Sequence, residues 1–210
     1  EVVSVMLAPD LLHIATLRSS VENFDGVPII HLRDSPLVGW SSVQKRVFDA
    51  VGSGLALVAF LPILLVLGVG IGLSSGWPIL YRQKRMGLDG RIFTMLKLRT
   101  MRRDAEKSGP GWSKIGDPRR TRFGVWLRRF SLDELPQLWN VLRGDMSLVG
   151  PRPLVMEYLE KYTPEQNRRH DVAPGVTGWA QVNGRESVPF SRRLVMDVWY
   201  VDHWGVLLDI

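Results

Sequence analysis

The sequence contains no cysteine, and this absence excludes disulfide-stabilised scaffolds and thiolate metal sites. Nothing in the composition therefore indicates an oxidising compartment, and we expect a protein that faces the cytoplasm. The chain also lacks an initial methionine and a signal-peptide pattern, and it stops inside an apolar run at Ile210. We therefore expect a piece of a longer protein.

Charged side chains are missing from Ala50 to Leu73. As a continuous helix this run would reach roughly 36 Å, enough to cross a hydrocarbon core of roughly 30 Å. Pro62 lies near its centre, where a proline removes a backbone hydrogen bond and kinks or breaks a helix. Two interpretations stay open: a kinked transmembrane helix, or a re-entrant hairpin of two short helices that meet at Pro62.

The basic residues around this run help to separate the two interpretations. Lys45 and Arg46 precede it, and three more follow it: Arg82, Lys84 and Arg85. A simple span is expected to carry its excess of positive charge on one side only. Basic flanks at both ends therefore favour the hairpin, with both ends on the same side of the membrane.

Acidic residues are in the minority, with 27 Lys and Arg against 21 Asp and Glu and a net charge of +6. The resulting pI near 10.0 indicates anionic partners such as nucleic acid, phospholipid headgroups or phosphorylated substrates. No helix-turn-helix, zinc-finger or RNA-binding signature is present, so we do not expect a nucleic-acid partner.

The first forty residues read as a small mixed segment. Strands are expected over Val2–Leu7 and Val27–Ile30, and Leu11–Val21 shows mixed helical periodicity. This order is compatible with a βαβ-like remnant, followed by a linker up to Trp40, which is suited to a membrane interface. Beyond the apolar run, β-prone stretches over 77–83 and 91–97 flank an Asp-Gly turn and predict a β-hairpin.

An arginine-rich helix and a pair of adjacent carboxylates follow. Helical spacing places one apolar stripe at Phe123, Trp126, Leu127 and Phe130. Arginines crowd the remaining positions, which is typical of a helix in a membrane interface, although a solvated basic face has the same composition.

Asp133 and Glu134 stand directly behind this helix and ahead of another apolar helix. That second helix begins either with a Ser131–Glu134 capping box or with Pro136 as its first residue. Acidic residues at helix starts are often only caps. A carboxylate beside Arg128, however, can also attack phosphorus or bind Mg²⁺, so the stretch indicates phosphoryl chemistry, with Asp145 and Arg152 as a further acid and cation.

Several long motifs then match a known family in order. They are "KRVFDAVGSGLAL", "YRQKRMGLDGRIFTMLKLRTM", "LRRFSLDELPQLWNVLRGDMSLVGPRPL", "PGVTGWAQVNGR" and "DVWYVDHW". From Ser42 to its end the chain resembles the bacterial sugar transferases known as monotopic phosphoglycosyl transferases, or polyprenyl-phosphate hexose-1-phosphate transferases. Residues 1–40 resemble the end of the Rossmann-like domain, plus a linker, of the larger undecaprenyl-phosphate glucose phosphotransferase type.

The resemblance implies an α+β, mainly helical catalytic domain over 41–210. It would contain a re-entrant membrane helix at about 47–75 broken at Pro62 and flanked by Lys45 and Arg46, interfacial amphipathic helices and a small β-hairpin. The implied activity is transfer of a sugar 1-phosphate from a UDP-sugar to polyprenyl phosphate, with release of UMP, at the cytoplasmic face of the bacterial inner membrane. The membrane lipid is a further partner, and a homodimer is compatible with the family.

The resemblance also implies roles for individual residues. Asp133 would be the nucleophile that forms an aspartyl-phosphosugar, and Glu134 would be a metal ligand or a base. Asp133, Glu134 and Asp145 are candidate ligands of Mg²⁺, with Mn²⁺ as an alternative ion. Candidate substrate-binding residues are Lys97, Arg99, Arg128, Arg152, Gln181, Asn183 and Arg185. The sugar, glucose or galactose, is not specified by any motif, and a non-catalytic membrane scaffold of a polysaccharide assembly complex is the alternative function.

Overall fold

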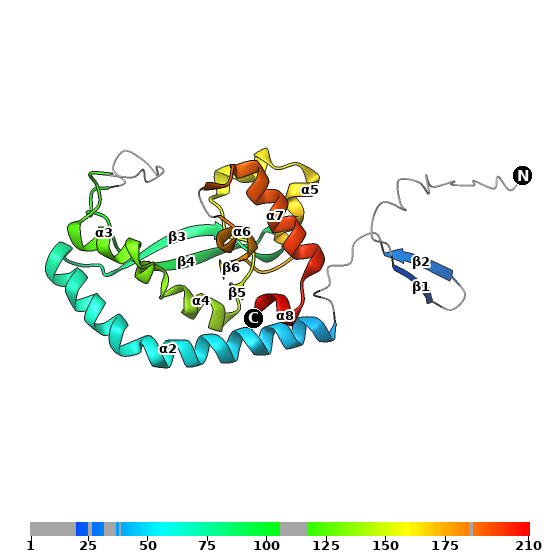
Figure 1. The fold of residues 1–210 in the computed structure, drawn as a ribbon, viewed down its shortest axis with the longest axis horizontal. Helices are drawn as coiled ribbons and strands as arrows, with labels where there is room; N and C mark the ends of the chain where they lie inside the picture. Colours follow the sequence, from blue (N-terminus) through cyan, green and yellow to red (C-terminus); the bar gives the residue numbers. More distant parts are fainter. Residues whose placement is uncertain (1–19, 25–26, 32–36, 38, 106–116, 185–186) are drawn as a thin grey trace, which may run out of the picture.

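The computed structural model describes residues 20–24, 27–31, 37, 39–105, 117–184 and 187–210. It is a mixed helical and β structure in which, from Trp40 onward, short sheets and helices rest on one very long helix (Figure 1). Strands β1 (Ser20–Phe24) and β2 (Val27–His31) form an antiparallel hairpin. The strand expected over Val27–Ile30 is confirmed, but Ser20 and Val21 belong to a strand and not to the expected helix. The strand expected over Val2–Leu7 lies outside the described residues.

Helix α2 (Trp40–Ser75) contains the whole apolar run and continues without interruption through Pro62. The expected break into two helices is therefore not confirmed. Pro62 lies on the exposed side of α2, and the helix curves around the remainder of the domain in Figure 1. Since a helix bends away from a proline, which cannot bond the carbonyl four residues earlier, curvature takes the place of a break here.

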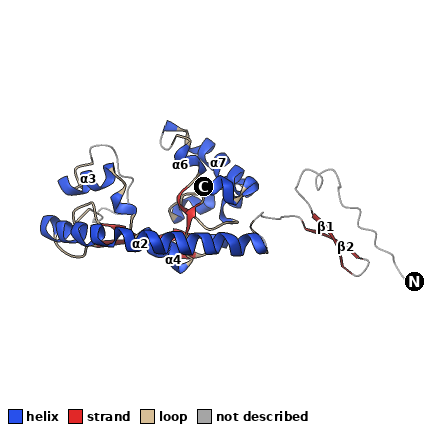
Figure 2. Cartoon of the chain, turned by 60° about the horizontal axis from the view of Figure 1, so that its bottom comes forward, coloured by secondary structure: helices blue, strands red, loops and turns tan. Residues whose placement is uncertain are grey.

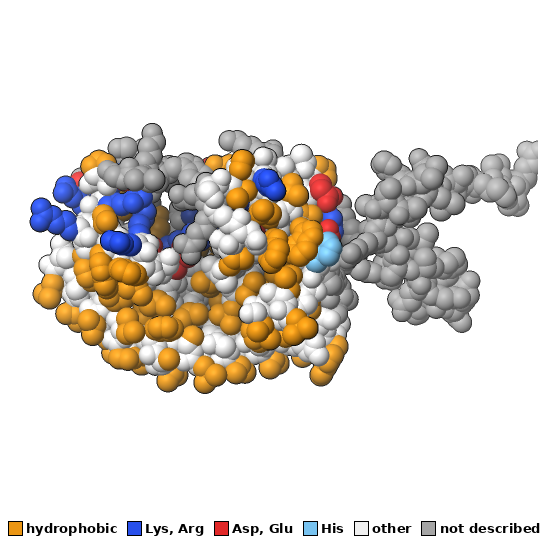
Figure 3. All heavy atoms as spheres, in the orientation of Figure 1, with side chains coloured by type: hydrophobic (Ala, Val, Ile, Leu, Met, Phe, Trp, Pro, Cys, Tyr) orange, Lys and Arg blue, Asp and Glu red, His pale blue; other side chains and the backbone are white. Residues whose placement is uncertain are grey.

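One side of α2 is apolar and uncovered. Only 17% of its most apolar window is buried inside the protein, so α2 is not an ordinary core helix. Hydrophobic side chains cover the surface along α2 in Figure 3. A row of large exposed side chains recurs every three or four residues: Val43, Val47, Val51, Leu55, Val58, Leu61, Leu65, Val69 and Leu73.

The predicted β-hairpin is confirmed. Strands β3 (Leu80–Met86) and β4 (Ile92–Leu98) pair antiparallel with Leu80 opposite Leu98, and the 3₁₀ turn η1 (Leu88–Gly90) joins them. Leu98 packs with Leu67 and Ile71 of α2 and with Leu127 of α3 (Arg122–Arg129) in one core cluster. The hairpin is thereby fixed between the long helix and the arginine-rich helix.

Helix α3 approaches its neighbours very closely. A Cβ at Gly124 would lie 2.0 Å from the Thr100 carbonyl oxygen, and a Cβ at Gly70 of α2 would lie 2.9 Å from Phe123. Thr121 caps the helix by accepting from the Gly124 N–H. Leu127 is fully buried while Trp126 and Phe130 are exposed, so α3 has the predicted amphipathic character.

The next elements are the 3₁₀ turn η2 (Leu132–Glu134) and helix α4 (Gln137–Arg143), which packs beside α2 (Figure 2). Ser131 adopts a left-handed conformation and makes no side-chain cap bond, so the capping-box placement of this helix start was wrong. Pro136 is the N-cap, so α4 begins at Gln137, one residue later than in the alternative placement with Pro136 as first residue. Asp133 therefore sits in the turn that precedes α4.

The C-terminal elements form a second layer above α2. Strand β5 (Ser147–Val149) pairs in parallel with β6 (Gly175–Thr177). Around this pair lie two 3₁₀ turns and four helices of the described chain: η3 (Met156–Lys161), α5 (Pro164–Asn167), η4 (Arg168–His170), α6 (Trp179–Val182), α7 (Phe190–His203) and α8 (Val206–Asp209). Val172, Tyr200 and Val201 form the core of this layer.

Candidate functional site

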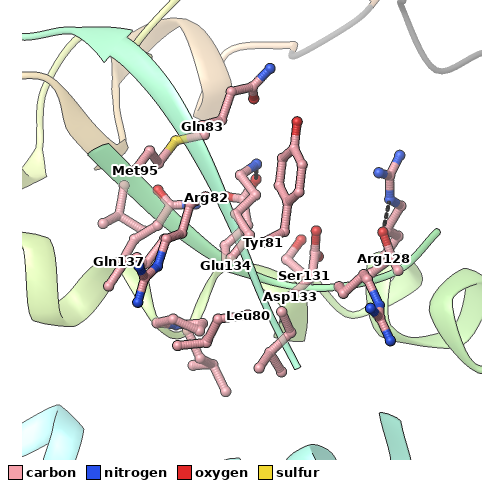
Figure 4. Close-up of a pocket in the computed structure, with 18 of the residues that line it drawn as sticks. Leu80, Tyr81, Arg82, Gln83, Met95, Arg128, Ser131, Asp133, Glu134 and Gln137 are labelled. Carbon is pink, nitrogen blue, oxygen red and sulfur yellow. Dashed lines mark hydrogen bonds and ion pairs between the residues drawn. The ribbon is translucent and has the colours of Figure 1, made fainter. Parts of the chain in front are cut away.

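Asp133 and Glu134 both line a large open pocket between the β3–β4 hairpin, α2 and the C-terminal layer. Figure 4 shows Tyr81 of β3 and Arg128 of α3 on either side of Ser131 and Asp133. The left-handed conformation of Ser131 reverses the chain between α3 and η2. This reversal places the carboxylates of η2 beside the cations of α3 and β4.

Glu134 is held by two cations. Its Oε1 atom accepts from Lys97 Nζ at 2.9 Å and from the Arg152 guanidinium at 2.7 Å. Burial acts to raise the pKa of Glu134, but Arg152 and Lys97 outweigh it and lower that pKa to about 2. Glu134 is therefore ionised at neutral pH and is engaged at one oxygen.

Asp133 has a different environment although it is the adjacent residue. Its side chain is buried, and burial raises its pKa, a shift that Lys97 opposes and Glu134 reinforces. No salt bridge to Asp133 forms within the described part of the chain. Two neighbouring carboxylates with oppositely shifted pKa values are a pattern found where two acids have separate chemical roles.

The predicted substrate-binding cations divide into those that face the pocket and one that binds backbone carbonyls. Lys97, Arg128 and Arg152 line the pocket with Asp133, and the Arg128 Nε donates to Thr100 Oγ1 at 2.8 Å. Arg99 also borders the pocket, but its guanidinium donates to the Ser75 carbonyl at 2.8 Å and to the Gly76 carbonyl. Arg99 therefore binds the C-terminal end of α2, which is a structural role.

Asp145 does not join Asp133 and Glu134. It follows the C-terminal end of α4, where its carboxylate accepts from Asn140 Nδ2 at 3.2 Å. No group of three or more acidic, histidine or cysteine side chains suited to a metal occurs among the described residues. The expected set of three carboxylate ligands is thus not assembled in this structure.

Of the three candidate residues in the Gly-rich turn at residues 174–185, one is placed in the pocket. Gln181 lines it, whereas Asn183 is exposed and bonds the Trp179 carbonyl at 2.9 Å. Arg185 lies outside the described residues. Gln181 is therefore the candidate from this turn that the structure brings to the site.

The basic pair before the apolar run has internal partners. Lys45 is buried and pairs with Asp49 at 3.2 Å and Asp209 at 2.5 Å. Arg46 donates to the Val141 carbonyl at 2.7 Å and to the Leu142 carbonyl. Both cations join the start of α2 to the domain, a role that flank charge alone did not predict.

Sequence reasoning missed two arginines near the site. Arg85 donates to Gln83 Oε1 at 2.6 Å and to the Pro153 carbonyl at 3.3 Å, and it lines the pocket. Arg169 is 2% exposed and donates to the Arg152 carbonyl at 2.6 Å. The alternation of Tyr81, Gln83 and Arg85 along β3 could have indicated Arg85, because alternate strand residues share a face. No sequence pattern indicated Arg169.

The pocket residues are compatible with Mg²⁺. This ion is commonly bound by one or two carboxylates together with substrate phosphates, and Asp133 and Glu134 supply two carboxylates. Glu134 would have to exchange part of its contact with Lys97 or Arg152 for the ion. Asp133, which makes no salt bridge within the described residues, needs no such exchange.

Taken together, the described part of the chain shows one long, largely exposed apolar helix, which is consistent with membrane association, and a carboxylate pair in a pocket lined by cations. Residues 40–210 match the family model described as bacterial sugar transferase. The chain belongs to this family.

Individual relatives agree with the family match. The chain is 45% identical to the uncharacterized sugar transferase EpsL of Bacillus subtilis (strain 168), over 80% of the chain and 82% of the relative. It is 41% identical to the UDP-glucose:undecaprenyl-phosphate glucose-1-phosphate transferase of Xanthomonas campestris pv. campestris, over 99% of the chain but 45% of the relative. It is 40% identical to the UDP-galactose-lipid carrier transferase of Erwinia amylovora, over 81% of the chain and 39% of the relative. The chain thus spans less than half the length of the Xanthomonas and Erwinia relatives.

Proposed function

We propose that this chain transfers a sugar 1-phosphate from a UDP-sugar to undecaprenyl phosphate and releases UMP. The observation that carries the proposal is the pair Asp133 and Glu134, adjacent in sequence but oppositely shifted in pKa, in a pocket that Lys97, Arg128 and Arg152 make cationic. A soluble diphosphate and a lipid phosphate both need such cations. The names of the relatives support the same substrates.

In the proposed first step, an oxygen of the Asp133 carboxylate attacks the phosphorus next to the sugar. A phosphorus–oxygen bond to Asp133 forms while the bond to the bridging oxygen breaks, and UMP leaves with that electron pair. In the second step an oxygen of the lipid phosphate attacks the same phosphorus and the Asp133 carboxylate is restored. Covalent catalysis divides one displacement between two polyanions into two easier steps.

The surrounding residues suit these steps. The raised pKa of Asp133 indicates a more basic carboxylate, and its freedom from salt bridges among the described residues leaves it able to attack. Lys97 and Arg152, which hold Glu134 before substrate arrives, can turn to the diphosphate oxygens. Asp133 and Glu134 would hold Mg²⁺ when it is bound, and the ion would supply charge stabilisation for the departing phosphate.

We further propose that α2 enters the membrane from the cytoplasmic side and does not cross it. Lys45 and Arg46 bind its start to α8 and α4, and Arg99 binds its end. Both ends of α2 are therefore tied to the same polar domain, and a polar domain cannot lie on both sides of a bilayer. The curvature at Pro62 and the apolar outer side of α2 fit an immersed helix whose ends return to one face.

The test of the reaction is UMP release from UDP-sugars by the detergent-solubilised or membrane-bound protein with undecaprenyl phosphate and Mg²⁺. Asp133→Asn should lower the rate at least about a hundredfold, because it removes the nucleophile. Asp145→Asn is the matched control, since Asp145 lies at the other end of α4, and it should retain the wild-type rate within about threefold.

A non-catalytic scaffold would release no UMP with any donor, and wild-type turnover in Asp133→Asn would exclude the covalent route. Incubation with a donor labelled in its sugar-proximal phosphate, without the lipid, should leave label on the protein in wild type only. Comparing UDP-glucose with UDP-galactose in the same assay addresses the donor sugar.

A further inference from the structure

The segment Pro151–Pro153 carries Arg152 into the pocket, and its sequence makes it unusually dependent on other parts of the chain. Two of its three residues are prolines, which have no backbone N–H, so the segment can form few hydrogen bonds as a donor. Its three carbonyl oxygens instead accept hydrogen bonds from other parts of the chain. The Gly175 N–H donates to Pro151 at 2.9 Å, and two arginines donate to the next two carbonyls.

Arg169 is the more deeply buried of these two arginines. Its guanidinium donates to the Arg152 carbonyl at 2.6 Å, to Asp197 Oδ2 at 2.7 Å and to the Tyr162 hydroxyl at 3.1 Å. Arg169 is 2% exposed and Asp197 is 4% exposed, so neither charge is solvated. A buried ion pair contributes little net stability compared with apolar packing, which favours a specific role for this one.

The contacts form a continuous chain from α7 to the carboxylate pair. Asp197 of α7 orients Arg169, Arg169 holds the Arg152 carbonyl, and the Arg152 side chain reaches Glu134 at 2.7 Å. Of these contacts, only the one between Arg152 and Glu134 joins two residues of the proposed chemistry. The first two set where the Arg152 backbone sits.

We propose that Arg169 and Asp197 are positioning residues that fix Arg152 against Glu134 and the donor diphosphate. The role of Arg152 in this inference rests on the proposed function. The contacts that position Arg152 do not depend on that function. A planar guanidinium directs several N–H groups to fixed points, whereas a lysine ammonium does not reproduce that fork. Arg169→Lys should therefore keep the charge and lose the alignment.

The chain supplies a matched control one residue away. Arg168 forms salt bridges with Asp202 of the same helix α7 and with Glu165, but it makes no contact with Arg152 among the described residues. The pairs Arg169–Asp197 and Arg168–Asp202 thus join the same two elements, η4 and α7. Only the first pair touches the segment that carries Arg152.

The first test is a double-mutant cycle in the UMP-release assay. Arg169→Lys should lower kcat/KM by about tenfold or more, and Arg168→Lys should change it by less than about threefold. In an Arg152→Ala background, Arg169→Lys should cost no more than about twofold further, because the residue it positions has been removed. Equal losses in both backgrounds would overturn the proposal, since a purely structural effect adds independently.

The second test does not depend on activity. The Gly175 N–H donates to the Pro151 carbonyl, so its amide hydrogen exchange reports on the segment; it should accelerate in Arg169→Lys and Asp197→Asn and stay at the wild-type rate in Arg168→Lys. Should Arg169→Lys fail to fold, Tyr162→Phe removes one of its hydrogen bonds and takes its place in both tests. Unchanged exchange would refute the positioning role, whereas a wild type without UMP release would refute only the proposed reaction.

Discussion

At the scale of single residues, burial weakens both charges that the proposed reaction needs. It raises the pKa of Asp133, although Lys97 opposes this shift, and it lowers the pKa of Lys97, although Glu134 opposes that one. Asp133 must be deprotonated to attack phosphorus, and Lys97 must be protonated to hold an anion. The two shifts narrow the pH range in which both conditions are met.

A bell-shaped pH profile of kcat/KM should result. As pH falls, activity should be lost when Asp133 is protonated, at a pH above the ordinary aspartate pKa because its pKa is raised. As pH rises, activity should be lost when Lys97 is deprotonated, at a pH below the ordinary lysine pKa because its pKa is lowered. Lys97→Arg should move the alkaline limb upward because an arginine stays charged. Initial rates of UMP release across pH give the profile, and an alkaline limb that Lys97→Arg leaves unmoved would assign it to another group.

The sequence predicted the residues that line the pocket better than those that hold the structure. Asp133, Glu134, Lys97, Arg128 and Arg152 were predicted and do line one pocket. Arg99 and Asp145 carry the same kinds of charge, but Arg99 donates to carbonyls at the end of α2, and Asp145 pairs with Asn140 and Arg143. Composition shows that a charge is present, and only the fold decides whether it meets a ligand or a backbone carbonyl.

At the scale of elements, α3 depends on the lack of a side chain at Gly124. An added Cβ would lie 2.0 Å from the Thr100 carbonyl oxygen, which is backbone and cannot rotate away. Gly124→Ala should therefore lower the free energy of unfolding by roughly 1–3 kcal/mol, despite the better helix propensity of alanine. Thermal unfolding in detergent measures the change.

Gly72→Ala in α2 is the control for this substitution, because no atom lies within 4 Å of the added Cβ. It should be neutral or slightly stabilising. The same displacement of α3 in Gly124→Ala should pull Arg128 from Thr100, so UMP release should fall more than the loss of folded protein explains. Equal stability of the two variants would contradict the close packing.

Elements with strong local signals were predicted well. The Asp-Gly turn specified the β3–β4 hairpin, and the spacing around Leu127 specified α3. The start of α4 was not predicted correctly. Both placements assumed an ordinary helix start at Ser131 or Pro136, but Ser131 takes a left-handed conformation and the turn η2 lies between it and α4. The continuity of α2 through Pro62 depends on packing along its whole length, which local proline chemistry does not contain.

At the scale of the whole molecule, the absence of cysteine allows a direct test of membrane topology. Single cysteines can be placed at two exposed positions: Ser42, in the first turn of α2, and Arg91, beyond the end of α2. If both ends return to the cytoplasmic face, a membrane-impermeant maleimide should label both in inverted vesicles and neither in intact cells. Labelling of one position from each side would establish a true span.

The attachments at the two ends of α2 have a practical consequence for anyone who wishes to purify the catalytic part. Deleting a membrane anchor is a common route to a soluble enzyme, and it works when the anchor is a separate module. Removing α2 here would leave Asp209 without Lys45, the last carbonyls of α4 without Arg46, and Arg99 without its acceptors. It would also strip Leu67 and Ile71 from a core cluster. Extraction of the intact chain in detergent or lipid nanodiscs is therefore the route that preserves the site.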